Sequence, residues 1–96
     1  MARLIWTLES ERWLKDIYEY IALDNPDAAE GVVVGIYDRA QSLLRFPESG
    51  YKYNGGSDDI RILLYGHYRI AYRKVDEEIV ILGVFHGALA IERYLI

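Results

Sequence analysis

The chain has 96 residues, of which 52% are hydrophobic and 27% charged, with a formal net charge of −4 and no cysteine. We expect one domain over residues 1–96 rather than a disordered chain, and the lack of cysteine excludes disulfide scaffolds, cysteine-ligated zinc and cysteine nucleophiles. No uncharged run is long enough to span a membrane and the N-terminus has no signal-peptide pattern, so we expect a cytoplasmic protein.

The first predicted elements are a short strand and a helix. The β-branched and aromatic residues of segment 3–7 favour a strand, and Thr7 is a suitable N-cap for a helix over 8–24. Apolar residues recur at helical spacing along this helix and predict its buried stripe: Leu14, Ile17, Tyr18 and Ile21.

A second helix is predicted from Pro26 to about Leu44. Asn25 is a good N-cap, and proline at the first helical position loses no needed hydrogen bond. The expected buried stripe consists of Val33, Ile36, Tyr37, Ala40, Leu43 and Leu44. Gly31 and Gly35 would allow this helix to pack closely on a sheet. Because about two residues join the two helices, we expect an antiparallel αα-hairpin.

The C-terminal half predicts a β-meander. We expect strands over 60–65 and 67–74, with Gly66 at the tight turn between them. Asp76-Glu77 marks the next turn, and segment 78–85 is apolar on both faces, as in a central strand. The order β-α-α-β-β-β predicts an α+β fold in which an N-terminal strand and the αα-hairpin pack on a small twisted antiparallel sheet.

Charge is unevenly distributed along the chain. Residues 1–50 carry five basic and nine acidic side chains, whereas residues 51–96 carry six of each. The window 60–75 contains no acid, and its basic and histidine residues are Arg61, His67, Arg69, Arg73 and Lys74. An acidic chain is a poor general binder of polyanions, but a local basic patch can hold a few phosphates or an acidic peptide.

Short motifs follow one another in order along nearly the whole chain. They are Trp-Thr at 6–7, Ile-Tyr-Glu-Tyr-Ile-Ala at 17–22, Asn-Pro-Asp-Ala-Ala at 25–29, Leu-x-x-Phe-Pro-x-x-Gly at 43–50, Tyr-Arg-Ile-Ala-Tyr at 68–72 and Ile-Leu-Gly-Val-Phe-His-Gly-Ala at 81–88. Together they resemble the RelE/ParE superfamily of toxins from type II toxin–antitoxin pairs. The resemblance implies the same fold and a cognate antitoxin whose C-terminal segment folds on this chain.

Members of the superfamily differ in target. The resemblance to RelE-like members implies a ribonuclease that cuts mRNA on the ribosome, with Arg69 supporting the transition state. Arg61 and Arg73 would add charge, and His86 or Tyr94 would transfer protons. RelE-like nucleases usually carry several basic residues in the C-terminal tail, but segment 87–94 has one arginine beside one glutamate. The net charge of −4 also fits poorly with docking into ribosomal RNA.

The resemblance to ParE-like members implies an inhibitor of DNA gyrase that needs a folded surface and no catalytic set. The ending His86-Gly87-Ala88 resembles the His-Gly that closes the last strand in many ParE-like chains. We therefore favour a gyrase-directed toxin that is not an enzyme. Two alternatives stay open: a RelE-like ribosome-dependent endoribonuclease, and a non-toxic relic that only binds its antitoxin.

The candidate residues for contact with the antitoxin or the target are Arg61, Arg69, Arg73 and Tyr94. Apolar antitoxin side chains would dock in a groove lined by the helices, and its acidic residues would meet the arginines. Instead of a functional role, these residues could have a structural one. Arg69 could pair with an acid from the helices, and His86 could be a structural histidine that is hydrogen-bonded at the end of a strand.

Neither a metal nor a cofactor is expected. His67 and His86 lie 19 positions apart with no carboxylate at a recognised metal spacing, and His67, after a turn glycine, is expected to be exposed and without a role. We also expect no membrane association and no sequence-specific DNA binding by the chain alone.

Overall fold

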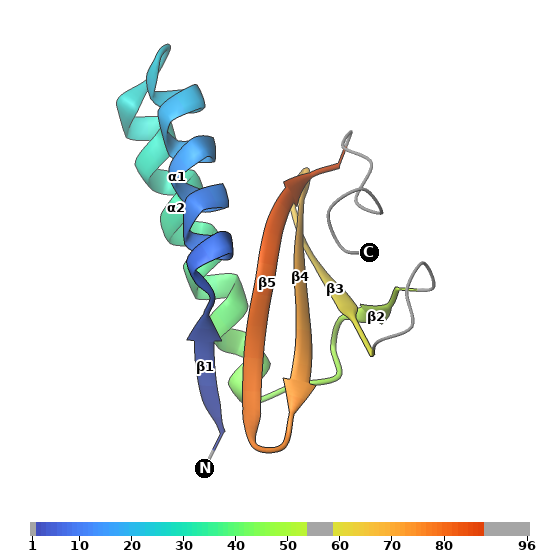
Figure 1. The fold of residues 1–96 in the computed structure, drawn as a ribbon. Helices are drawn as coiled ribbons and strands as arrows, with labels where there is room; N and C mark the ends of the chain where they lie inside the picture. Colours follow the sequence, from blue (N-terminus) through green and yellow to red (C-terminus); the bar gives the residue numbers. More distant parts are fainter. Residues whose placement is uncertain (1, 54–58, 88–96) are drawn as a thin grey trace.

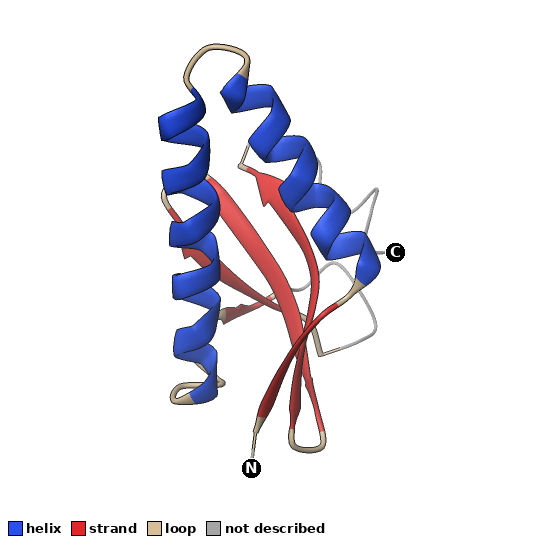
Figure 2. Ribbon diagram, turned by 90° about the vertical axis from the view of Figure 1, so that its left-hand side faces the viewer, coloured by secondary structure: helices blue, strands red, loops and turns tan. Residues whose placement is uncertain are grey.

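The structure is a computed structural model that describes residues 2–53 and 59–87. Its elements are β1 (Arg3–Trp6), α1 (Leu8–Ala22), α2 (Pro26–Gln41), a 3₁₀ helix η1 (Ser42–Leu44), β2 (Tyr51–Lys52), β3 (Arg61–Tyr65), β4 (Tyr68–Val75) and β5 (Glu78–His86). The helices form a hairpin beside a curved sheet (Figures 1 and 2), which confirms the predicted α+β fold. Among the described residues, no helix combines the length and apolar character that crossing a membrane requires.

The five strands form one mixed sheet in the order β1-β5-β4-β3-β2. Strands β3, β4 and β5 make the predicted antiparallel meander, and β5 is an interior strand as expected. The sheet differs from the predicted all-antiparallel sheet at one edge, where β1 pairs with β5 in parallel and Arg3 lies opposite Glu78. No tight turn joins these two strands, so no local geometry imposes an antiparallel pairing. The two-residue strand β2 was not predicted because it is too short to show a periodic pattern.

Both predicted helix starts are confirmed. The Thr7 hydroxyl accepts a hydrogen bond from the Ser10 amide at 3.1 Å and donates one to the Ile81 carbonyl of β5 at 2.8 Å. The Asn25 side chain accepts a hydrogen bond from the Ala28 amide at 3.1 Å, directly before Pro26. These side chains satisfy amides that a helix leaves free at its start, and Thr7 also ties α1 to the sheet.

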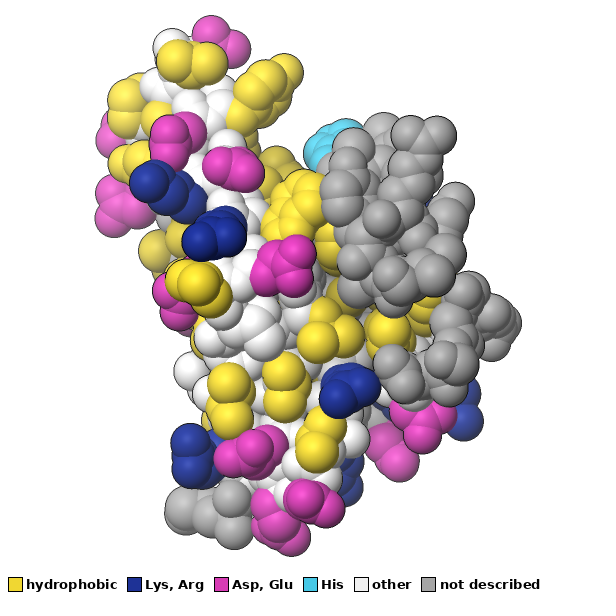
Figure 3. Space-filling view, in the orientation of Figure 1, with side chains coloured by type: hydrophobic (Ala, Val, Ile, Leu, Met, Phe, Trp, Pro, Cys, Tyr) yellow, Lys and Arg dark blue, Asp and Glu magenta, His cyan; other side chains and the backbone are white. Residues whose placement is uncertain are grey.

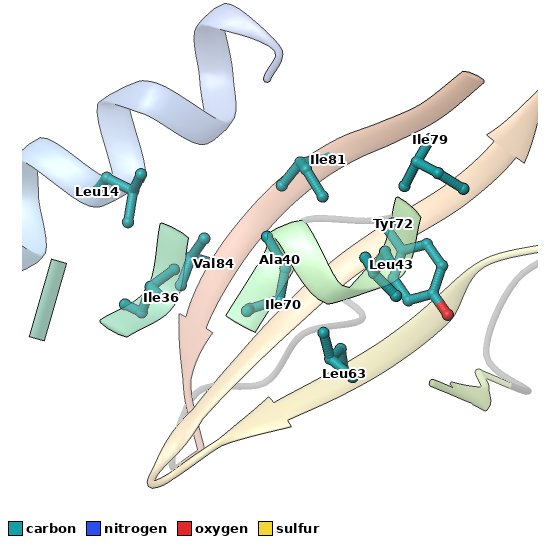
Figure 4. Close-up of a cluster of buried hydrophobic side chains, with 10 residues drawn as sticks. All are labelled: Leu14, Ile36, Ala40, Leu43, Leu63, Ile70, Tyr72, Ile79, Ile81 and Val84. Atoms are coloured by element: carbon teal, nitrogen blue, oxygen red, sulfur yellow. The ribbon is translucent and has the colours of Figure 1, made fainter. Parts of the chain in front are cut away.

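The main core lies between the helical hairpin and the sheet (Figure 4). Its buried members are Leu14, Ile36, Ala40, Leu43, Leu63, Ile70, Tyr72, Ile79, Ile81 and Val84. The predicted stripes are wrong at two positions, because Tyr18 and Tyr37 are 41% and 38% exposed. Helical spacing finds the centre of an apolar stripe, but the sheet decides how wide a stripe it can cover.

A second, smaller cluster lies on the other face of the sheet. Its buried members are Ile60, Ile62, Ala71 and Phe85, and Trp13 of α1 packs edge-on against Phe85 with ring centroids 4.7 Å apart. The sheet is therefore apolar on both faces over its central strands.

Helix α2 lies very close to β3 at one point. A side chain at Gly35 would overlap the ring of Tyr65, so this position has room only for glycine. Gly31 has open space around it, so of the two predicted packing glycines only Gly35 makes a close approach to the sheet.

Candidate functional site

Strand register places the predicted arginines on different faces of the sheet. Residues that pair directly across strands share a face. Arg61 pairs with Tyr72, which belongs to the core under the helices. Arg69 pairs with Leu64 and alternates with Tyr72 along β4, so it lies on the opposite face together with Arg73. The structure therefore does not bring Arg61 and Arg69 to one surface.

Arg61 is held by the chain's own backbone. Its Nη1 donates hydrogen bonds to the Gly50 carbonyl at 2.7 Å and to the Glu48 carbonyl at 3.2 Å. Next to it, the Tyr72 hydroxyl donates to the Pro47 carbonyl at 2.9 Å and accepts from the Gly50 amide at 3.0 Å. These four hydrogen bonds fasten segment 47–50 to strands β3 and β4.

Burial raises the pKa of the Tyr72 hydroxyl above its ordinary value. The nearby Glu48 carboxylate acts in the same direction, whereas the hydrogen bond from Gly50 and the Arg61 guanidinium act in the opposite direction and only partly offset burial. The hydroxyl therefore stays protonated at neutral pH and keeps its role as a hydrogen-bond donor.

Arg69 and His86 lie together in a pocket of about 280 Å³ at the end of the sheet. The lining residues are Leu64, Gly66, His67, Tyr68, Arg69, His86 and Gly87. The Arg69 Nη2 donates to the Gly87 carbonyl at 3.3 Å, and the Gly87 amide donates to the His67 carbonyl at 2.6 Å. We call this the histidine pocket.

His67 is exposed, as expected from the sequence, and it lines this pocket although the sequence predicts no role for it. Gly66 has a φ of +57°, which lets β3 and β4 join through a two-residue turn and puts His67 at its end. The imidazoles of His67 and His86 have ring centroids 6.2 Å apart, and the Tyr68 ring meets His86 edge-on at 5.6 Å. Finding this pair from the sequence would require the strand register. Tyr68 directly follows His67 and lies opposite both Tyr65 of β3 and His86 of β5, so the turn that contains His67 is beside the end of β5.

The chemistry of the histidine pocket favours an anionic group. Its described lining contains no aspartate or glutamate, and it combines a guanidinium with two imidazoles that can carry or transfer protons. Burial raises the pKa of Tyr68, which keeps its hydroxyl protonated. Within residues 2–53 and 59–87, no three histidine, aspartate or glutamate side chains gather in a way that could hold a metal.

Of the other two candidate residues, the structure describes only Arg73, which does not line this pocket. Arg73 is half-buried on the same face as Arg69, opposite Val80 of β5. Tyr94 and the predicted C-terminal tail lie outside the described residues.

A separate groove of about 430 Å³ runs between the two helices. Its lining residues are Leu8, Glu11, Arg12, Leu14, Lys15, Tyr18, Val33 and Tyr37. The groove is mainly apolar and explains why Tyr18 and Tyr37 are exposed, since they form its walls. We call it the helix groove.

Comparisons with known proteins agree with this architecture. The family model described as "ParE toxin of type II toxin-antitoxin system, parDE" matches residues 4–90. The "Putative toxin Y4kP" of Sinorhizobium fredii (strain NBRC 101917 / NGR234) is 37% identical over 85 residues, which cover 88% of each chain. A structure described as "Chromosomal ParDE TA system from P. aeruginosa" matches with a TM-score of 0.77 and 25% identity, over 90% of this chain and 96% of that one. The chain therefore belongs to the ParE toxin family of type II toxin–antitoxin systems.

Proposed function

We propose that this ParE-family toxin inhibits DNA gyrase and is neutralised by a ParD-type antitoxin. The observation that carries the proposal is the separation of the arginines. Arg61 is tied to the carbonyls of Glu48 and Gly50 on the helix-covered face, so it does not join Arg69 at a common phosphate. An inhibitor that acts by binding needs no such assembly, and the net charge of −4 favours a protein target over ribosomal RNA.

The antitoxin is expected to use the helix groove and the sheet face that carries Arg69 and Arg73, which we call the arginine face. Apolar antitoxin side chains would cover Tyr18, Val33 and Tyr37 in the groove. Each antitoxin side chain that becomes fully buried would contribute about 1.5–3 kcal/mol. Acidic antitoxin residues would meet Arg69 and Arg73 on the far face of the sheet. Because these surfaces lie on opposite sides of the molecule, we expect the antitoxin segment to wrap around the toxin in an extended form, as flexible segments that fold on binding do.

A supercoiling assay with purified toxin, gyrase and relaxed plasmid tests the proposed target. We expect inhibition that the antitoxin reverses, and growth arrest with a DNA-damage response when the toxin is induced alone. Unchanged supercoiling together with cut transcripts on ribosomes would contradict the proposal. Antitoxin binding without growth arrest would instead indicate a relic.

The contact between antitoxin and arginine face has its own test. An Arg69→Glu change should weaken the complex in calorimetry, because it replaces attraction to an acidic segment with repulsion. Tyr20→Phe, which alters an exposed residue of α1 rather than of the sheet, serves as the control. Unchanged affinity for Arg69→Glu would place the antitoxin elsewhere.

A RelE-like ribonuclease is the second candidate, and the histidine pocket is the observation that favours it. Arg69 could hold a phosphate there while His67 and His86 transfer protons. Under this alternative, His86→Gln would abolish toxicity in cells, whereas a gyrase inhibitor would keep its effect on supercoiling.

A further inference from the structure

The outer part of the helical hairpin, residues 16–38, has an unusual charge composition. We call it the hairpin tip. It contains six acids and neither lysine nor arginine, so it carries −6 while the rest of the chain carries +2. Its acids are Asp16, Glu19, Asp24, Asp27, Glu30 and Asp38, all of them exposed. Within the described part of the chain, Glu19 pairs with Lys15 at 3.9 Å and the other five form no ion pair.

Large apolar side chains are exposed among these acids. Tyr20 of α1 is 78% exposed, and Leu23, the C-cap residue directly after the helix, is 84% exposed. They lie three residues apart, and because Leu23 keeps helical backbone angles they are neighbours on the helix surface. Val34 of α2 is also exposed. Figures 1 and 2 show that the turn joining the helices extends past the end of the sheet, and Figure 3 shows hydrophobic and acidic side chains side by side there. The sheet therefore does not cover these apolar residues.

We propose that the hairpin tip is the surface with which this toxin contacts gyrase, and that its partner there is a lysine- and arginine-rich protein surface. This inference rests on the proposed function. An enzyme that grips DNA must present cationic side chains to the phosphates. A segment with six negative and no positive side chains complements such an array and steers the encounter, while exposed Tyr20 and Leu23 supply apolar contact area.

The hairpin tip shares Tyr18, Val33 and Tyr37 with the helix groove, but the tip residues varied below do not line that groove: Tyr20, Leu23, Asp24 and Glu30. The helix groove lies nearer the start of α1 and its charged lining is mixed, with Glu11 beside Arg12 and Lys15. Arg69 and Arg73 lie on the far face of the sheet. Variants of the tip can therefore be tested for target binding while antitoxin binding is followed as a separate measurement.

The first test changes charge at the tip. Asp24→Lys with Glu30→Lys brings the formal net charge from −4 to 0, as does the control pair Glu48→Lys with Asp59→Lys, and all four positions are exposed. Full-length toxin variants are compared for half-inhibition of gyrase supercoiling and for binding to immobilised gyrase. Relative to wild type, we expect the concentration that half-inhibits supercoiling to rise at least about tenfold for the tip pair and to change by less than about twofold for the control pair.

The second test changes the apolar contact. Tyr20→Gln with Leu23→Gln should weaken gyrase inhibition, whereas Phe46→Gln with Tyr51→Gln, which also alters two exposed apolar residues, should not. Circular dichroism and antitoxin binding check that each variant is folded. The wild-type affinity for gyrase should also fall as salt concentration rises.

The outcomes separate this inference from the proposed function. Inhibition by both tip variants at wild-type concentrations, or an equal loss in the charge-matched control, would overturn the assignment of the tip and leave the gyrase target intact. Wild-type toxin that neither binds nor inhibits gyrase would overturn the proposed function and the inference with it. Selective loss in the tip variants supports both.

Discussion

Replacing Tyr72 by phenylalanine isolates the hydrogen bonds that fasten segment 47–50 to the sheet. The Tyr72 side chain is fully buried, and the change keeps its ring while removing one donor and one acceptor. The Gly50 amide is then left buried without its partner, whereas the half-buried Pro47 carbonyl can still reach water. A buried unsatisfied polar group costs about 1–3 kcal/mol, so we expect the free energy of unfolding to fall by about 2 kcal/mol.

Urea and thermal unfolding followed by circular dichroism measure this loss. A change of about 2 kcal/mol lowers the Tm of a domain this size by about 8–16 °C. The control is Tyr20→Phe, which removes an exposed hydroxyl and should change stability by less than about 0.5 kcal/mol. If Tyr72→Phe costs no more than this control, the hydroxyl does not hold segment 47–50 and the reasoning is wrong.

Three further predictions concern stability. Because burial raises the pKa of Tyr72, the folded state holds this proton more tightly than the unfolded state. The contribution of this proton to the free energy of unfolding should be fully present below about pH 10, the ordinary pKa of tyrosine, and should be lost as the pH rises above it. The decrease should be less steep in Tyr72→Phe, and urea unfolding between about pH 9 and 11 measures it. Gly35→Ala should cost about 1–3 kcal/mol because its methyl group overlaps Tyr65, and Tyr65→Leu should restore part of that loss in denaturant unfolding. Asp76 has a φ of +55°, a backbone conformation that favours glycine, so Asp76→Gly should raise Tm by relieving about 1 kcal/mol of backbone strain. An unchanged or lower Tm would contradict this.

Much of the fold could be predicted from residues close in sequence. Thr7 and Asn25 cap their helices, and Gly66 makes a two-residue turn, through contacts that span at most four residues. Arg69 and Tyr72 lie three positions apart on β4, and side chains alternate along a strand, so their opposite orientation also follows from the sequence once the strand is known. Such local interactions act in any context, so the sequence pattern alone predicts them.

The arrangement of the candidate site depended on pairing between distant segments. His67 and His86 lie 19 positions apart and meet only because β4 and β5 pair with one particular register. Arg61 could be an exposed cation by its spacing, but its guanidinium bonds to the carbonyls of segment 48–50, which a sequence pattern does not show.

The sequence by itself determined the helices, the meander strands, their turns and the acidic character of the hairpin tip, because period, caps and charge are properties of neighbouring residues. Only the tertiary structure decided the parallel pairing of β1 with β5, the separation of Arg61 from Arg69, and the exposure of Tyr18 and Tyr37. These features depend on strand register and on how far the sheet extends beneath the helices, and both result from packing between segments far apart in the chain.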